Sequence, residues 1–137
     1  RVCAVSNKIH YNEMNVLSMH ALIGAYQPQG YEWVDELNRV LAGNIEYFCD
    51  YVDEHFEGVS YSRPQGTYMV FLDCTEWCRE HGRDIQWLLD EGARVGVGYQ
   101  DGRPFHGPCH IRVNLALPLS RVREACDRLD RYVFNAR

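Results

Sequence analysis

The segment His110–Pro118 constrains the fold more than any other part of this chain, because its residue types alternate. It runs His-Ile-Arg-Val-Asn-Leu-Ala-Leu-Pro, with a large aliphatic side chain at every second position. This period of two predicts a β-strand that sets one face against a core and the other away from it. Pro118 ends the predicted strand, and a helical pattern follows it.

The same alternation places Arg112 and Asn114 on the face away from the core. On the strand pattern alone, the ordinary interpretation is that both side chains face water. The alternative is that a guanidinium on a rigid strand binds a carboxylate or a phosphate, since its planar fork matches two oxygen atoms. The spacing of the residues leaves both interpretations open.

Length and charge narrow the class of protein. The chain has 137 residues, enough for one domain, and a net charge of -5 without any basic stripe. This balance disfavours a nucleic-acid partner. No apolar run approaches the roughly 20 residues that cross a bilayer, and the first residues lack the order of a signal peptide, so we expect no membrane span and a cytoplasmic location. The chain starts without methionine inside an apolar segment, Val2–Val5, so we expect it to be a piece of a longer protein.

Six scattered cysteines are typical of buried thiols in a reducing compartment. Cys74 and Cys78, together with His106, Cys109 and His110, are residue types that bind zinc. Their spacing matches no usual zinc motif, and adjacent residues 109 and 110 point to opposite faces of a strand. We therefore expect no metal site.

Periodicity along the rest of the chain predicts the order of the elements. The expected helices cover residues 13–26, 31–56, 84–91 and 120–133, and the expected strands cover residues 59–62, 67–72, 92–98 and 110–117. Asp84 and Ser120 are the expected N-caps, and Gly58 is expected to end the long helix. We expect a turn at 27–30, a loop or irregular helix at 73–82 and a loop at 99–108. This order predicts an α+β fold. A small, mainly antiparallel sheet has helices packed on it and is preceded by a long linking helix.

Three segments, residues 64–73, 101–105 and 110–118, together resemble a known family. They are similar to the carboxy-terminal third of the fold-type I pyridoxal phosphate (PLP) enzymes, the class I and II aminotransferases. The run Gly-Thr-Tyr-x-x-x-Leu-Asp from Gly66, and the run Gly-Tyr-x-Trp-Val-Asp-Glu-Leu at 30–37, most resemble the cystathionine β-lyase branch, which cleaves carbon–sulfur bonds.

The resemblance implies a domain organisation and one binding residue. Residues 1–30 would be a remnant of the large domain and its connecting helix, residues 31–56 the long interdomain helix, and residues 57–137 the small domain. Arg112 stands where the family has the arginine that binds the α-carboxylate of the amino-acid substrate. The complete enzyme would use PLP as cofactor, would include a large amino-terminal domain missing here, and would form a homodimer.

The departures from the family concern the cofactor. The Schiff-base lysine and the other cofactor ligands are expected upstream of this chain, and its single lysine, Lys8, does not fit. Ser6-Asn7-Lys8 is one residue shorter than the family's Ser-x-x-Lys and follows the apolar strand that should come after the lysine. The chain alone is therefore expected to hold no catalytic or cofactor-binding residue and to be inactive. An aminotransferase domain and a free-standing, non-catalytic small-ligand-binding domain remain as alternatives.

Overall fold

A computed structural model describes residues 14–136, so the expectations for Val2–Val5, for Lys8 and for a helix start at Glu13 lie outside the described residues. The chain divides into two compact units, one ending at Asn38 and the other beginning at Arg39. Helix α3 (Pro28–His55) contributes to both. The expected α+β class, with a long helix ahead of a small antiparallel sheet, is confirmed.

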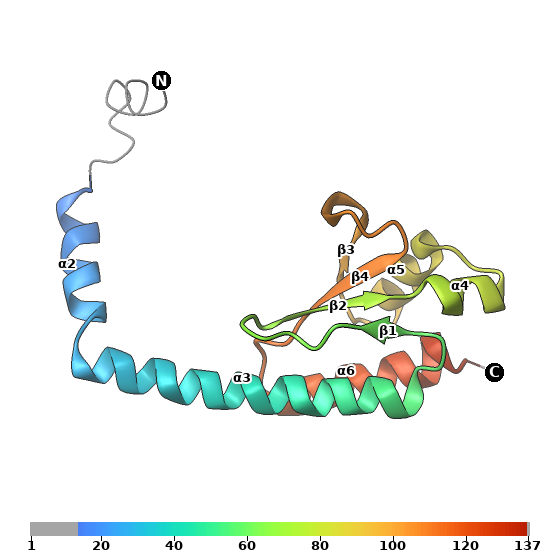
Figure 1. The fold of residues 1–137 in the computed structure, drawn as a ribbon, viewed down its shortest axis with the longest axis horizontal. Helices are drawn as coiled ribbons and strands as arrows, with labels where there is room; N and C mark the ends of the chain where they lie inside the picture. Colours follow the sequence, from blue (N-terminus) through green and yellow to red (C-terminus); the bar gives the residue numbers. More distant parts are fainter. Residues whose placement is uncertain (1–13, 137) are drawn as a thin grey trace, which may run out of the picture. The chain divides into compact units, whose positions relative to one another are not determined.

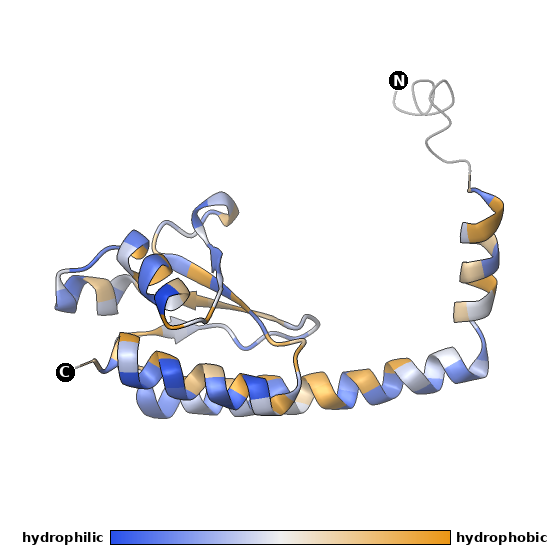
Figure 2. Ribbon diagram, turned by 180° about the vertical axis from the view of Figure 1, so that it is seen from behind, coloured by the Kyte–Doolittle hydropathy of each residue, from blue (hydrophilic) through white to orange (hydrophobic). Residues whose placement is uncertain are grey.

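The first unit contains helix α2 (Val16–Ala25) and the start of α3. Asn15 caps α2, because its Oδ1 accepts a hydrogen bond from the Ser18 amide at 2.9 Å. The turn predicted at 27–30 is shorter and lies earlier: Tyr26 and Gln27 separate the two helices, and α3 already begins at Pro28. A proline fits the first helical turn because its missing N–H would have no partner there. Most of α2 is hydrophobic (Figure 2), yet none of its residues is buried.

The second unit is built on a four-stranded sheet with the order β1-β2-β4-β3, in which every pair is antiparallel (Figure 1). The strands are β1 (Ser60–Tyr61), β2 (Met69–Asp73), β3 (Gln100–Asp101) and β4 (His110–Asn114). Strands β2 and β4 form the centre of the sheet. Their register sets Phe71 opposite Arg112 and Asp73 opposite His110.

Helices connect and flank these strands. They are α4 (Thr75–His81), α5 (Ile85–Arg94), the 3-10 turn η1 (Arg103–Phe105), and α6 (Leu119–Leu129), which continues as the π-helical segment η2 (Asp130–Phe134). The predicted cap at Asp84 is confirmed, because its Oδ1 accepts from the Trp87 amide at 2.8 Å. The predicted cap at Ser120 is wrong: the helix begins at Leu119, and no side chain caps it.

The predicted strand at 92–98 is also wrong. Helix α5 continues through Gly92 to Arg94, and Gly96 adopts a positive φ of 77°. A Cβ on Gly92 would lie 2.5 Å from the Tyr99 ring, so glycine lets that ring pack against the helix. The valines of this segment alternate as in a strand, but they belong to the turn that ends α5. The sheet edge is instead the two-residue strand β3.

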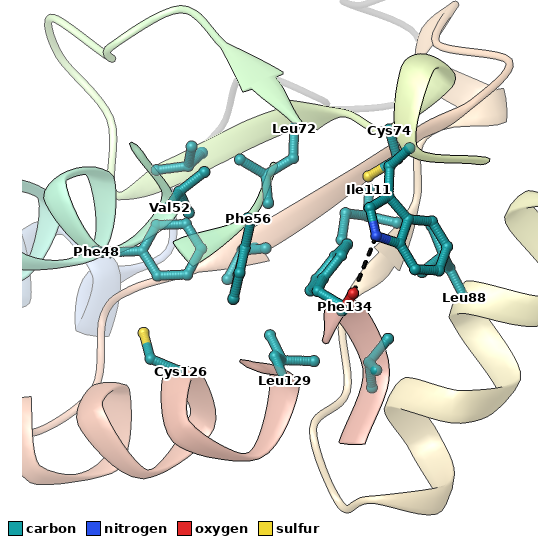
Figure 3. Close-up of a cluster of buried hydrophobic side chains, with 14 of the residues drawn as sticks. Phe48, Val52, Phe56, Leu72, Cys74, Leu88, Ile111, Cys126, Leu129 and Phe134 are labelled. Atoms are coloured by element: carbon teal, nitrogen blue, oxygen red, sulfur yellow. Dashed lines mark hydrogen bonds between the residues drawn. The ribbon is translucent and has the colours of Figure 1, made fainter. Parts of the chain in front are cut away.

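The hydrophobic core lies between the sheet and the helices (Figure 3). From the sheet, Leu72 and Ile111 are fully buried. They are packed with buried side chains of α3, α4, α5, α6 and η2, among them Phe48, Val52, Trp77, Leu88, Cys126, Leu129 and Phe134. This core fixes one face of β2 and β4, and therefore leaves the positions between its residues on the other face.

One polar side chain belongs to this interior. Asn44 of α3 is 1% exposed, and its Nδ2 donates to the carbonyl oxygens of Leu115 at 2.8 Å and Leu117 at 2.7 Å. These two carbonyls directly follow β4, where the ladder has ended. Asn44 therefore ties the chain leaving β4 to the long helix.

Candidate functional site

Strand β4 presents Arg112 on the face opposite the core, as the alternation predicts. Ile111, Val113 and Leu115 are buried, whereas Arg112 is half-buried and Asn114 exposed. The predicted strand is longer than the observed one, because the ladder ends at Asn114. Leu117, predicted for the core face, is 46% exposed.

We call the non-core face of the two central strands the open face, and define it by Phe71, Asp73, His110, Arg112 and Asn114. All five side chains are partly or largely exposed. Phe71 and His110 have ring centroids 4.6 Å apart. Arg112 pairs with Phe71 on β2. The open face thus places a guanidinium and an imidazole next to one aromatic ring.

The Arg112 guanidinium lies over an aromatic ring. Its Cζ lies 3.9 Å from the centroid of the Phe105 ring, which is a close cation–π contact. Within residues 14–136, Arg112 forms no salt bridge, and its guanidinium donates no hydrogen bond. Its five N–H donors are therefore available to an external acceptor.

The loop that carries Phe105 lies close over the start of β4. The Gly102 amide donates to the His110 carbonyl at 2.9 Å, and a Cβ at Gly102 would collide with that same oxygen. A Cβ at Gly107 would lie 2.5 Å from Phe71 Cζ. Both positions therefore require glycine, because the backbone itself packs against the open face.

Beside Arg112, a polar hollow of about 290 Å³ lies over β1, β2 and β4, lined by Ser60, Tyr61, Ser62, Phe71, Asp73 and His110. His110 Nε2 lies 3.7 Å from Asp73 Oδ2, and His110 Nδ1 is buried without a hydrogen-bond partner in the described chain. Burial acts to raise the pKa of Asp73, but hydrogen bonds from the Thr75 side chain and amide outweigh it, so the pKa is lowered. Asp73 is therefore anionic at neutral pH.

A second, more apolar cavity of about 370 Å³ lies among α3, the turn at 96–98, β4 and α6. Its lining includes Phe48, Val97 and Leu129, with Arg121 and Glu124 also contributing. Arg121 and Glu124 are ion-paired with one another at 2.8 Å, so their charges are already matched.

The prediction of buried thiols is confirmed for most of the cysteines within residues 14–136. Cys49, Cys74, Cys78 and Cys126 are buried, whereas Cys109 is half-buried. Burial raises the pKa of Cys78 and of Cys126 to about 12, and raises that of Cys74 further, so these thiols stay protonated. Across residues 14–136, no group of three or more His, Cys, Asp and Glu side chains is arranged to hold a metal ion.

Residues 14–136 contain no lysine, so this part of the chain offers no amine for a cofactor carbonyl. In the same range, no helix has the length and apolar character that a membrane span requires. Arg112 is predictable from the sequence, where the loop Asp101–Phe105 contributes only to the family resemblance. The contact between that loop and Arg112 is a finding of the structure.

The chain is similar to known proteins in sequence and in fold, although no family model matches it. It is 34% identical over 124 residues to a protein of Mycobacterium leprae named "Putative cystathionine beta-lyase", and 33% identical over 128 residues to one of the same name from Mycobacterium tuberculosis. Each match covers 79% of this chain and 30% of the relative. The chain therefore spans about a third of the length of these relatives.

Solved structures share the fold over almost the whole chain. The PLP-bound C-S lyase from Staphylococcus hominis matches 93% of this chain with a TM-score of 0.78 and 23% identity, over 33% of its own length. A PLP-bound putative aminotransferase from Clostridium difficile also matches 93%, with a TM-score of 0.80 and 25% identity, over 32% of its length.

Proposed function

We propose, on the premise that this chain corresponds to the carboxy-terminal part of the fold-type I PLP-dependent enzymes of aminotransferase class I and II, that it is the C-terminal domain of a C–S β-lyase. In this role it would bind the α-carboxylate of the substrate. The names of the mycobacterial relatives favour cystathionine or another cysteine thioether as the substrate. Residues 1–30, 31–56 and 57–137 would be the large-domain remnant, the interdomain helix and the small domain. The complete enzyme would be a cytoplasmic homodimer.

The observation that carries this proposal is the position of Arg112 and its lack of an acidic partner among residues 14–136. It stands on a central strand, on the face opposite the core, without an acidic partner among residues 14–136. A guanidinium in this state can receive a carboxylate through two parallel N–H···O bonds. The α-carboxylate of an amino acid provides such a pair of oxygen atoms.

PLP, when bound in the complete enzyme, would supply the electron sink that stabilises negative charge at the substrate Cα. Residues 14–136 contain no lysine that could bind that cofactor, so we assign this part of the chain a role in substrate binding. Arg112 would hold the carboxylate and thereby fix how the substrate bonds at Cα are oriented. A charge-assisted bidentate contact stabilises binding by about 1.5 to 3 kcal/mol, or roughly ten- to a hundredfold.

The test is steady-state kinetics on the full-length gene product loaded with PLP, using L-cystathionine. Arg112→Gln should raise KM about tenfold or more, because glutamine cannot make the charged fork. Arg83→Gln is the matched control, since the Arg83 guanidinium also lies over an aromatic ring, that of Trp87, at 4.8 Å. An unchanged KM in Arg112→Gln would refute the assignment.

The second candidate is an aminotransferase, supported by the Clostridium difficile neighbour at 25% identity. Both functions use the same carboxylate contact, so the products separate them. Release of pyruvate and ammonia from a thioether identifies the lyase, whereas dependence on a 2-oxo acid identifies the transferase. Failure of both activities, with retained binding of amino acids, would support a non-catalytic small-ligand-binding domain.

A further inference from the structure

The contact between Phe105 and Arg112 joins the η1 turn to strand β4. Phe105 is 47% exposed, so its position is not explained by burial in the core. Its ring nevertheless lies 3.9 Å from the Arg112 Cζ. A large apolar side chain held over a cation at the surface points to a functional role for the ring.

The loop around Phe105 is built to hold that ring in place. The Gly102 carbonyl accepts hydrogen bonds from the amides of Phe105 at 2.9 Å and Gly107 at 3.1 Å. His106 then turns the chain with a φ of 62°, in the left-handed region. Because Gly102 is also bonded to the His110 carbonyl, the loop is anchored to the strand that carries Arg112.

A polar anchor fixes the other side of the same loop. Arg103 forms an ion pair with Asp101 at 2.7 Å and donates to the Gln86 Oε1 of α5 at 3.0 Å. The Asp101 side chain also accepts from the Arg103 amide at 2.9 Å. These contacts connect the loop to both β3 and α5, so little freedom remains for the backbone at Phe105.

We propose that Phe105 is a positioning residue for Arg112, and this inference rests on the proposed function. Arginine has several rotatable bonds, and no acidic side chain among residues 14–136 restricts this one. The guanidinium Cζ lies over the Phe105 ring, 3.9 Å from its centroid. The N–H donors lie in the guanidinium plane, so this contact restrains the group without occupying the edge that receives a carboxylate.

This role predicts a specific pattern in the kinetics of the full-length gene product with L-cystathionine. Phe105→Leu keeps an apolar side chain but removes the π face, and should raise KM about two- to fivefold, the range expected for an exposed cation–π contact. Phe105→Tyr keeps the ring and should restore the wild-type KM. The half-exposed position lets both variants fold, which melting temperatures verify.

A direct readout on Arg112 separates positioning from a general structural effect. In arginine-labelled protein, the ring current of Phe105 should shift the Arg112 Nε–Hε signal upfield, and Phe105→Leu should abolish that shift. The signal of Arg83, which lies over Trp87, should not move. An unshifted Arg112 signal in the wild type, or the same KM for Phe105→Leu and wild type, would overturn the inference.

The two proposals fail in distinguishable ways. If Arg112→Gln leaves KM unchanged, the carboxylate site itself is wrong, whatever Phe105 does. If Arg112→Gln raises KM strongly while Phe105→Leu changes neither KM nor the Arg112 signal, the binding site stands and only the role of Phe105 is refuted.

Discussion

Replacing Asn44 by leucine should destabilise the second unit strongly, although leucine is similar in size and apolar. The substitution removes the Nδ2 donor that bonds to the carbonyls of Leu115 and Leu117 at 2.8 and 2.7 Å. A buried acceptor without a partner costs about 1–3 kcal/mol, and the Leu115 bond is fully buried whereas the Leu117 bond is partly buried. The better helix propensity of leucine returns about 0.5 kcal/mol. The expected net loss is about 2–3 kcal/mol of unfolding free energy.

Urea unfolding of the whole chain measures this loss. With a slope of about 1–3 kcal/mol per molar urea, the midpoint should fall by about 0.7–3 M. Asn38→Leu is the matched control: it lies in the same helix but is exposed, so its free energy should change by less than about 0.5 kcal/mol. Equal unfolding free energies for the two variants would refute the reasoning that Asn44 holds the chain leaving β4.

Two further predictions concern side chains outside the site. Gly92→Ala should lower the melting temperature and the free energy of unfolding by about 1–3 kcal/mol, because the new Cβ would lie 2.5 Å from the Tyr99 ring. Gly98→Ala is the control and should not lower the melting temperature, since no atom lies within 4 Å of its Cβ. Equal effects of the two substitutions would contradict the packing argument. Iodoacetamide at pH 8 should label Cys109 before Cys74, since Cys109 is half-buried whereas Cys74 is buried and its pKa is raised. Peptide mass spectrometry measures the order of labelling, and labelling of Cys74 first would refute this prediction.

The elements that the sequence predicts well are those whose pattern is set by the core. Strand β4 follows its alternation because Ile111 and Val113 must be buried together, and Asp84 caps α5 as its side-chain chemistry requires. The errors fall where packing overrides local preference. Gly92 favours a strand end by composition, but it lies in helix α5, where the absence of a side chain leaves room for the Tyr99 ring.

Of the two residues proposed for the candidate site, Arg112 was predictable from the sequence and Phe105 was not. Arg112 is visible in the sequence because a charge within a strand pattern is unusual, and the family resemblance adds its role. Phe105 lies seven positions earlier in a loop, where no periodicity relates it to β4. Its contact depends on the close approach of Gly102 to the His110 carbonyl, which only the folded backbone reveals.

Helix α2 has a consequence for the behaviour of this polypeptide in solution. Its ten residues, Val16–Ala25, include no aspartate, glutamate, lysine or arginine. Electrostatic repulsion between copies must therefore come from the rest of the chain, whose net charge is -5 at pH 7 and vanishes near the isoelectric point of about 5.6. Mild acidification should therefore remove the charge repulsion that opposes association through the exposed apolar side chains of α2, and purification should be carried out well above that pH.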